Sequence, residues 1–481
     1  MFFAIAAQAS WNLVSFDIPT AFLQQDKSYM ANRRQYLYLL PPPELRSFED
    51  EVWECEKVPY GCTDAPRAWY FTFSEWLKEN DGRPVAGDGC IYTFYDKKGD
   101  LCGQLVVHVD DGIMAGTEEF LKHMRPLLRR RWTIENFSEN DFKFCGLWIQ
   151  KKKNGDIHVT QDKYSEMVTE IPMTRARAAQ VTQKMTPKEI KEVQSVAGAA
   201  NWMSTQTRPD LAFDVSELVG LISHDGTVQC IKKANKLVKK VKSGSESCLI
   251  FRRLQNCTLK QLRVVAYSDA SWANMPAMKS QSGQVFCLAG ETHANYGTNM
   301  FKNMETFRGN LIHWRSQRIK RVCRSTFAAE TLSAIDAIDQ GIYLRDMLVG
   351  WLNLDKLDDD GRPTIPLQLY SDCNSLCETL EMVEPKATEK RLRLDLTSMK
   401  ENLDNGTLSA FTWLDTRIQV ADALTKHMDV SSMMKYFYYG HFPYWFDDSN
   451  DNQQCSEKYT SNQEKLRALM AFEQIKDVYG D

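Results

Sequence analysis

Apolar residues recur along the chain with one of two periodicities. A repeat of about 3.6 positions predicts a helix, and alternation at every second position predicts a strand. Near the start they predict a helix, a strand over 11–17, a turn at Pro19 into a helix, and a strand over 53–58. A helix over 67–80 and a hairpin over 104–116 with Asp-Asp-Gly at its turn follow. A helix over 118–131 and a hairpin around Asn154-Gly155 complete this part. Helices then fill roughly 187–243.

The pattern of strands starts again near residue 262. It predicts a strand over 263–270, two strands punctuated by glycine, a long helix over 325–352, a strand ending near Asp372, another helix and a last strand before Asp422. This order predicts an α/β arrangement with mixed strand directions. The tail from about 445 opens polar and ends in an amphipathic helix.

Length and composition limit the class of protein. A chain of 481 residues is too long for one compact core, so two to four domains are expected. The 43% hydrophobic and 25% charged residues are typical of a soluble globular protein, and no apolar run approaches the length of a membrane span. The 13 cysteines lack zinc-site spacing, which favours reduced thiols in an intracellular protein.

Four carboxylates in the second half carry the strongest chemical signal. They are Asp269 in YSDAS, Glu330 in FAAET, Asp372 in YSDCN and Asp422 in ADALTK, and we call them the downstream acids. If they meet, they cannot all stay ionised side by side without cations. Oxygen ligands favour magnesium or manganese, and paired metals suit phosphodiester chemistry.

A second acidic set lies far upstream, and we call its members the upstream acids: Asp17, Asp110 and Asp111. Asp17 follows the hydrophobic strand WNLVSF, and Asp110 and Asp111 follow LVVHV. Burial of an unpaired carboxylate at such a strand end is costly. If the two strands present these acids at the same end, they would form a metal site. Two separate clusters suggest two reactions on nucleic acid.

Every acid also has a structural interpretation that the sequence leaves open. Asp372 and Asp422 could cap helices, Glu330 could favour the first turn of its helix, and Asp269 could be a polar strand end. The Asp-Asp-Gly run could be a hairpin turn on an exposed edge. Against this, Glu330 shares one face of its helix with three small residues, Ala334, Ala337 and Gly341. This stripe predicts that the helix lies close on a sheet.

Five motifs in the first half resemble the reverse transcriptase of copia-type LTR retrotransposons. They are FDIPTAFLQ, YGCTDAPRAWY, VHVDDGIMAG, CGLWIQKKKNGDIHVTQDKY and TQTRPDLAFDVS. The resemblance implies that the upstream acids hold two magnesium ions, which align a primer hydroxyl with an incoming dNTP. It also implies that Phe22 excludes a 2′-hydroxyl, although a core aromatic explains Phe22 as well.

Three departures from the family pattern bear on DNA synthesis. His108 stands where the family has tyrosine, and Thr63 and Asp64 replace a lysine and a glutamine. The sequence begins just ahead of Asp17, so the resemblance predicts an N-terminally truncated copy with weak or absent polymerase activity. The alternative is a decayed or domesticated fragment that binds nucleic acid, with ribonuclease H activity at most.

The second half is similar to the ribonuclease H domain of the same elements. The matching runs are YSDASWA, KSQSGQVFCLAG, STFAAETLSA, LYSDCNS and ADALTK. The resemblance implies that the downstream acids cut the RNA strand of RNA–DNA hybrids with two metal ions. An insertion over roughly 291–310 departs from the pattern, either as a loop over the hybrid or as a degenerate patch.

The combined prediction is an α+β multidomain protein, with a partial right-hand polymerase palm followed by a ribonuclease H-like α/β domain. The expected segments are 1–180 as fingers remnant and palm, 181–260 as helical thumb or connection, 261–428 as the ribonuclease H-like domain and 429–481 as a tail. The implied partners are RNA template, DNA primer, hybrid and dNTPs, with no membrane. The expected location is a cytoplasmic retrotransposon particle or the nucleus.

Local basic runs are the candidate nucleic-acid surface of a chain whose net charge is −4. Six lysines lie within 231–243, three at 151–153, and five basic residues precede the Glu330 helix: Arg315, Arg318, Lys320, Arg321 and Arg324. Such runs are either solvated faces or a groove that follows phosphates.

Overall fold

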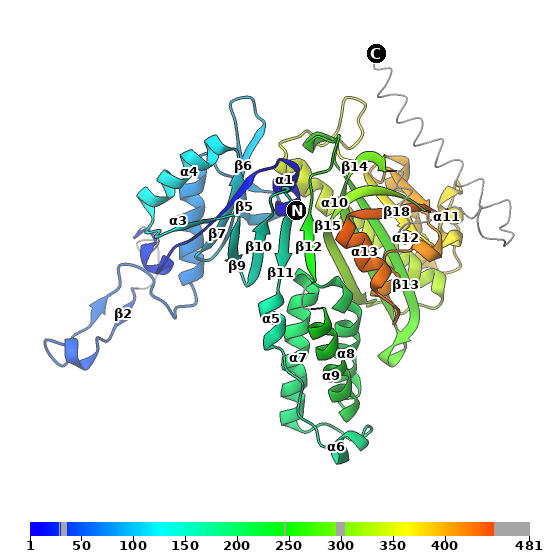
Figure 1. Ribbon diagram of the computed structural model, residues 1–481, viewed down its shortest axis with the longest axis horizontal. Coiled ribbons are helices and arrows are strands. Elements are labelled where there is room, and N and C mark those ends of the chain that lie inside the picture. Colours follow the sequence, from blue (N-terminus) through cyan, green and yellow to red (C-terminus); the bar gives the residue numbers. More distant parts are fainter. Residues whose placement is uncertain (28, 30–35, 245–246, 295–303, 447–481) are drawn as a thin grey trace.

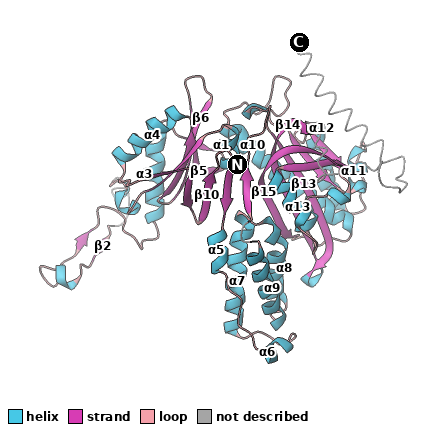
Figure 2. Cartoon of the chain, viewed as in Figure 1, coloured by secondary structure: helices cyan, strands magenta, loops and turns pink. Residues whose placement is uncertain are grey.

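Figure 1 shows the computed structural model of the chain, which describes residues 1–27, 29, 36–244, 247–294 and 304–446. Within these residues, two six-stranded sheets lie to either side of a four-stranded sheet, and a bundle of helices extends below it (Figure 2). A small arm made by β2 (Tyr38–Leu39) and β3 (Trp53–Glu54) projects from the first sheet. The chain is therefore α+β, as the sequence predicts.

The first six-stranded sheet has the order β4-β5-β6-β7-β1-β8. Its strands are β1 (Asn12–Asp17), β4 (Arg83–Val85), β5 (Asp88–Tyr95), β6 (Leu101–His108), β7 (Asp111–Gly116) and β8 (Phe137–Glu139). Helices α3 (Ala65–Glu79) and α4 (Glu118–Arg131) supply its apolar partners, and Trp69 of α3 makes a T-shaped contact with Trp132, which directly follows α4. Strand β1 lies inside this sheet, so Asp17 is placed beside the β6–β7 turn.

The four-stranded sheet has the order β12-β11-β10-β9 and carries the helical bundle. Its strands are β9 (Asp141–Phe144), β10 (Leu147–Lys151), β11 (Ile157–Thr160) and β12 (Cys248–Phe251). The helices between β11 and β12 are α5 (Asp162–Met167), α6 (Arg175–Ala179), α7 (Pro187–Gln206), α8 (Ala212–His224) and α9 (Val228–Ser243). The bundle has its own apolar core and is anchored to the sheet at both ends.

The second six-stranded sheet has the order β17-β16-β13-β14-β15-β18. Its strands are β13 (Arg263–Met275), β14 (Lys279–Ala294), β15 (Met304–Arg318), β16 (Leu367–Ser371), β17 (Ala410–Trp413) and β18 (His441–Phe446). Strands β13, β16 and β17 run parallel, and the other pairings are antiparallel. This mixed sheet confirms the predicted ribonuclease H-like α/β fold.

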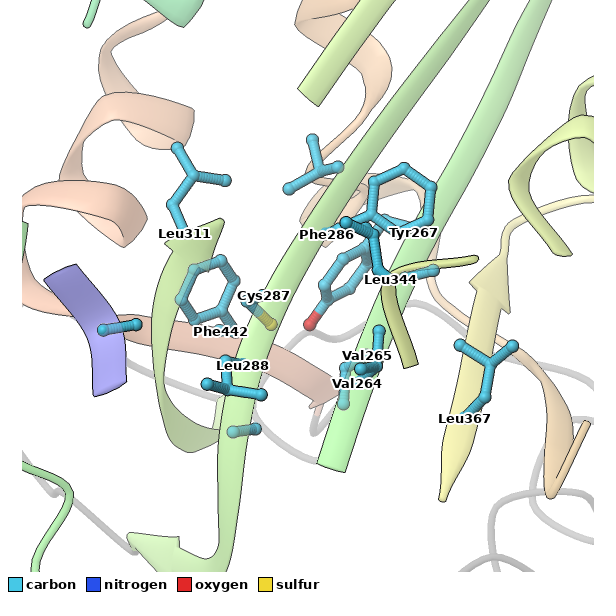
Figure 3. Close-up of a cluster of buried hydrophobic side chains, with 14 of the residues drawn as sticks. Val264, Val265, Tyr267, Phe286, Cys287, Leu288, Leu311, Leu344, Leu367 and Phe442 are labelled. Carbon is cyan, nitrogen blue, oxygen red and sulfur yellow. The ribbon is translucent and has the colours of Figure 1, made fainter. Parts of the chain in front are cut away.

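Helices α10 (Thr326–Trp351), α11 (Asn374–Glu381) and α12 (Lys390–Asp404) accompany this sheet. Figure 3 shows the core, where Tyr267 of β13 and Phe286 of β14 lie near Leu344 of α10 and Phe442 of β18. Complete burial of such a side chain contributes about 1.5–3 kcal/mol. The apolar core therefore fixes α10 and the sheet strands that carry acids.

The N-terminal helix α1 (Phe2–Gln8) is confirmed as a helix, and it packs into this same core. Gln8 secures it, because its Nε2 donates to the carbonyl oxygens of Leu254 (3.1 Å) and Cys257 (2.6 Å). Its Oε1 accepts from the Leu254 amide at 2.7 Å. The start of the chain is thus tied to the segment that leads into β13.

Several sequence predictions need correction. The 104–116 hairpin turns at Val109 and Asp110, while Asp111 and Gly112 already belong to β7, because Gly112 packs against the Phe16 ring. The segment after Pro19 is only a four-residue 3₁₀ helix, η1 (Ala21–Gln24).

Two segments that the sequence sets apart join the second sheet. The region assigned to a tail contains α13 (Ser431–Tyr439) and β18, and β18 pairs with β15. The insertion over 291–310 includes the start of β15, where Met304–Arg308 pairs with β18, while 295–303 lie outside the described residues. The amphipathic helix expected in the tail also falls outside them, and the domain boundaries remain predictions.

Candidate active sites and nucleic-acid surface

The structure brings the downstream acids to one end of the second sheet. Asp269 lies in the middle of β13, Glu330 lies on α10, Asp372 directly follows β16, and Asp422 begins the 3₁₀ helix η7 (Asp422–Leu424). One oxygen atom from each of Asp269, Glu330 and Asp372 lies within 4.8 Å of the other two. Within the described part of the chain, these are the acids gathered closely enough to share a metal ion.

Helix α10 places Glu330 at the site because the residues on the face that contacts the sheet are small. Ala334 and Ala337 are fully buried, and a Cβ added at Gly341 would lie 2.7 Å from the Leu367 side chain on β16. Hydrogen bonds fix the helix along its axis, since Ser333 Oγ donates to the Asp269 carbonyl at 2.8 Å. The small-residue stripe therefore places Glu330 beside Asp269, as its spacing predicts.

Asp422 reaches the site because β14 carries a glycine opposite Asp269. A Cβ at Gly283 would lie 2.7 Å from the Thr425 methyl and 2.8 Å from the Ala421 carbonyl, so η7 can lie directly on the strand. The Thr425 hydroxyl then donates to Asp269 Oδ2, and Lys426 Nζ lies 2.7 Å from Asp422 Oδ1. Asp372 is held separately by Gln419 Nε2, which lies 3.4 Å from its Oδ1.

The structural interpretations of these acids are wrong. Neither α11 nor η7 has a side-chain cap, so Asp372 and Asp422 do not act as N-caps. Glu330 lies beyond the first turn of α10, and Asp269 is 4% exposed inside a strand rather than at its end. Their placement is therefore explained by neither capping nor exposure at a strand end.

The electrostatic state of the site follows from burial and mutual repulsion. Burial, together with the charges of Asp422 and Asp372, raises the pKa of Asp269 to about 7. Burial and the nearby aspartates raise the pKa of Glu330 well above its ordinary value, and burial raises the pKa of Asp372. Burial lowers the pKa of Lys426, but Asp422 and the other acids outweigh burial and raise it. A cation bound between these acids would relieve the same repulsion.

The donor set fits a hard divalent cation. Carboxylate oxygens are the ligands that magnesium and manganese prefer. Oε2 of Glu330 is buried and has no hydrogen-bond partner among the described residues, and such an atom is costly unless something compensates it. A cation held between Asp269, Glu330 and Asp372 would supply that compensation.

The upstream acids lie closer to the surface. Asp17 ends β1 and faces Asp111 across the β1–β7 ladder, while Asp110 lies in the turn between β6 and β7. Burial and the charges of Asp110 and Asp111 raise the pKa of Asp17, and burial raises the pKa of Asp111. The three carboxylates share one end of the sheet, but their oxygens are not gathered as closely as those of Asp269, Glu330 and Asp372.

The turn that carries Asp110 is held in a demanding conformation. Val109 has φ of 60°, in the left-handed region that β-branched residues rarely occupy. Its carbonyl accepts a hydrogen bond from Trp69 Nε1 at 2.5 Å, and the Asp110 carbonyl accepts from the Ile18 amide at 3.0 Å. The run is therefore a hairpin turn, as the structural interpretation has it, but because β6 and β7 are interior strands it does not lie on an edge of the sheet.

Other predicted positions near the upstream acids have structural partners. The Phe22 ring lies 4.6 Å from the Tyr60 ring, so it packs beside the turn that precedes α3. Asp64 lies at the start of α3 without a side-chain capping bond, and His108 pairs with Asp111 in the hairpin ladder.

The basic runs differ in how far their charges are available. On α9, Lys233 pairs with Glu217 and Lys240 lies 2.6 Å from Asp214, both on α8. The exposed lysines of α9 form one stripe: Lys232, Lys236, Lys239 and Lys242. Among the described residues, these four form no ion pair, so they provide a positive face on an otherwise acidic chain.

The other runs are partly structural. Lys151 Nζ donates to the carbonyl oxygens of Ser10 (3.1 Å) and Trp11 (2.9 Å), so it holds β10 against the start of β1. Arg321 lies 2.7 Å from Asp395 of α12. These two residues stabilise the fold rather than offer a free charge.

Sequence reasoning misses the side chains that hold the acids in place. Thr425 and Lys426 lie in the ADALTK run, yet the pattern points only to its aspartate, because Thr425 and its partner Asp269 are more than 150 positions apart. Ser333 is hidden in the same way within the Glu330 helix. Their polarity next to a buried acid is the signal that could have found them.

Comparison with known proteins confirms the predicted resemblance. Residues 1–186 match the family model described as reverse transcriptase (RNA-dependent DNA polymerase). The chain is 23% identical over 452 residues to the Retrovirus-related Pol polyprotein from transposon RE1 of Arabidopsis thaliana, covering 90% of this chain and 27% of that protein. It is 21% identical over 460 residues to the Transposon Ty1-NL2 Gag-Pol polyprotein of Saccharomyces cerevisiae, covering 89% and 24%.

The chain spans about a quarter of the length of these curated relatives. Among solved structures, the foamy viral protease-reverse transcriptase in complex with RNA/DNA hybrid has a TM-score of 0.45 at 12% identity, covering 87% of this chain and 45% of that one. LC11-RNase H1 in complex with RNA/DNA hybrid has a TM-score of 0.23 at 17% identity, covering 34% and 94%. None of the described helices is long and apolar enough to span a membrane.

The raised pKa values predict how stability depends on pH when no divalent cation is bound. A carboxyl with a raised pKa in the folded state contributes stability below pH about 4, and this contribution is lost as pH rises towards 7. In EDTA, the unfolding midpoint of the unchanged protein should therefore fall over this range more steeply than that of Asp269→Asn. Thermal unfolding at several pH values measures it, and parallel curves for the two proteins would contradict the electrostatic account.

Proposed function

We propose that the chain cleaves the RNA strand of RNA–DNA hybrids at the downstream acids. The observation that carries this proposal is that buried, mutually repelling carboxylates meet on a ribonuclease H-like sheet. One of their oxygens, Oε2 of Glu330, has no hydrogen-bond partner among the described residues. Such a cluster is costly without cations and suits two-metal hydrolysis with them. The similarity to Pol polyproteins supports the same reaction class.

The four acids divide the work of holding the cations. Asp269, Glu330 and Asp372 would share one ion, and Asp422 would extend the set towards a second. Bound magnesium or manganese would supply the charge that activates a water molecule and stabilises the leaving oxygen. Thr425 and Ser333 orient this ligand set through the side chain and the carbonyl of Asp269 respectively.

We further propose that residues 1–186 belong to an RNA-directed DNA polymerase, with two divalent ions held by the upstream acids. The family match supports this assignment. The partners would be an RNA template, a DNA primer and dNTPs. The alternative is a decayed or domesticated retroelement fragment that binds nucleic acid, and the acidic Asp64 at the head of α3 favours it for this half. The proposed location is a cytoplasmic retrotransposon particle or the nucleus.

The nuclease assignment predicts magnesium-dependent cleavage of hybrid RNA by the full chain. Asp269→Asn and Asp372→Asn keep the side-chain shape but remove a charged ligand, so the rate should fall by about 10²-fold or more. Cleavage of a labelled hybrid measures it, with Asp339→Asn on the exposed side of α10 as the matched control. Cleavage at the unchanged rate by either ligand variant would show that the assignment is wrong.

The polymerase assignment, together with the departures from the family pattern at Thr63 and Asp64, predicts that extension of a primed RNA template is weak. Two-metal transfer needs the triphosphate held in line with the primer hydroxyl, and small misplacements are expensive. Thr63→Lys combined with Asp64→Gln should raise extension in part, and Phe22→Ala should then admit ribonucleotides. Primer extension on gels measures each change. Extension that survives Asp110→Asn would place the polymerase site elsewhere.

The lysine stripe of α9 predicts where the hybrid binds. Changing Lys232, Lys236, Lys239 and Lys242 to glutamate should weaken hybrid affinity and reduce its salt dependence, by about 0.9 in logarithmic slope for each phosphate that the protein no longer neutralises. Fluorescence anisotropy at several salt concentrations measures this slope. Lys97→Glu with Lys98→Glu, in the exposed β5–β6 turn, is the control. An unchanged slope in the α9 variant would make the stripe a solvated face.

A further inference from the structure

The segment Asp422–His427 touches the nuclease acids from one side. Its first residue is itself one of the acids, its Thr425 hydroxyl donates to Asp269, and its Lys426 ammonium lies 2.7 Å from Asp422. The Thr425 hydroxyl also lies 3.0 Å from the Asp422 carbonyl, which closes the turn. A displacement of this segment would therefore move the oxygens of two acids at once.

The same segment is anchored to the helical bundle from the other side. His427 Nε2 lies 3.0 Å from Glu217 Oε2, and its Nδ1 lies 3.5 Å from Asp214 Oδ1, both on α8. The His427 ring also meets the Phe213 ring edge to face, with centroids 4.9 Å apart. Both carboxylates are shared with α9, through Lys233 and Lys240. His427 thus joins a charge network that spans two helices of the bundle.

A second polar path runs alongside the first. Gln281 Nε2 on β14 donates to Ser216 Oγ of α8 at 3.0 Å and to Ser316 Oγ of β15 at 2.8 Å. Ser316 in turn donates to the Leu424 carbonyl at 2.6 Å. Helix α8, the sheet and the segment are therefore linked at two points, which leaves little freedom for α8 to move without the segment.

We propose that His427 is a positioning residue that couples the helical bundle to the cation site of the nuclease. The inference rests on the proposed nuclease function. Groups that orient metal ligands without touching the metal typically change metal affinity by about 10–100-fold when removed. Because coupling between sites is reciprocal, a hybrid held by the α9 stripe and a cation held by the downstream acids strengthen each other's binding.

Calorimetric titration of Mn²⁺ into the full chain tests this coupling. His427→Ala should weaken cation binding by about tenfold, and His427→Gln, which keeps a hydrogen-bond donor, should restore part of it. His224→Ala is the matched control, because this residue is equally exposed, ends α8 and pairs with Asp225 rather than with the network. Saturating hybrid should tighten Mn²⁺ binding in the unchanged chain and less so in His427→Ala.

The outcomes separate the two proposals. Asp269→Asn identifies the heat that belongs to the downstream acids, so absence of that heat in the unchanged chain overturns the nuclease proposal. Mn²⁺ binding of equal strength in the unchanged chain and in His427→Ala overturns the coupling alone. If His427→Ala does not fold, Glu217→Ala removes the same anchor from the α8 side, and equal binding there overturns the coupling in the same way.

Discussion

The repulsion among buried carboxylates at one end of the second sheet is the constraint on which the rest of the structure depends. Asp269 and Glu330 are 4% and 6% exposed, so water screens their charges poorly. Three features bring the acids together despite this cost: the small residues on the contact face of α10, the glycine at position 283 and the Thr425 hydroxyl. Together these features place Asp269, Glu330 and Asp422 in one site.

The apolar core supplies the free energy that offsets this cost. One cluster of buried side chains runs from α1 through the four-stranded sheet to β13, α10 and β18. The helical bundle has a separate core, and polar contacts also join it to the second sheet, among them the bond from Trp314 Nε1 to the Ser204 carbonyl at 2.7 Å. These polar contacts tie the bundle to the segment that carries Asp422, while the apolar core holds the strands and the helix that carry the other three acids.

The sequence predicts most local elements and the convergence of the acids on the second sheet, because apolar periodicity and the small-residue stripe are local signals. It does not predict the pairing of β18 with β15, nor the contact of His427 with Glu217, since residues far apart in the sequence meet only through tertiary packing. The position of the β6–β7 turn escapes prediction for another reason. Asp-Gly favours turns locally, but the fit of Gly112 against Phe16 moves that pair into the strand.

The most direct test is to locate the cation itself. Crystals of the full chain grown with Mn²⁺ should show an anomalous difference peak between the carboxylates of Asp269, Glu330 and Asp372, with metal–oxygen distances of about 2.0–2.2 Å. Addition of an RNA–DNA hybrid to an inactive variant should bring a second peak beside Asp422. A well-ordered ribonuclease H-like sheet without any anomalous peak at these acids would contradict the account.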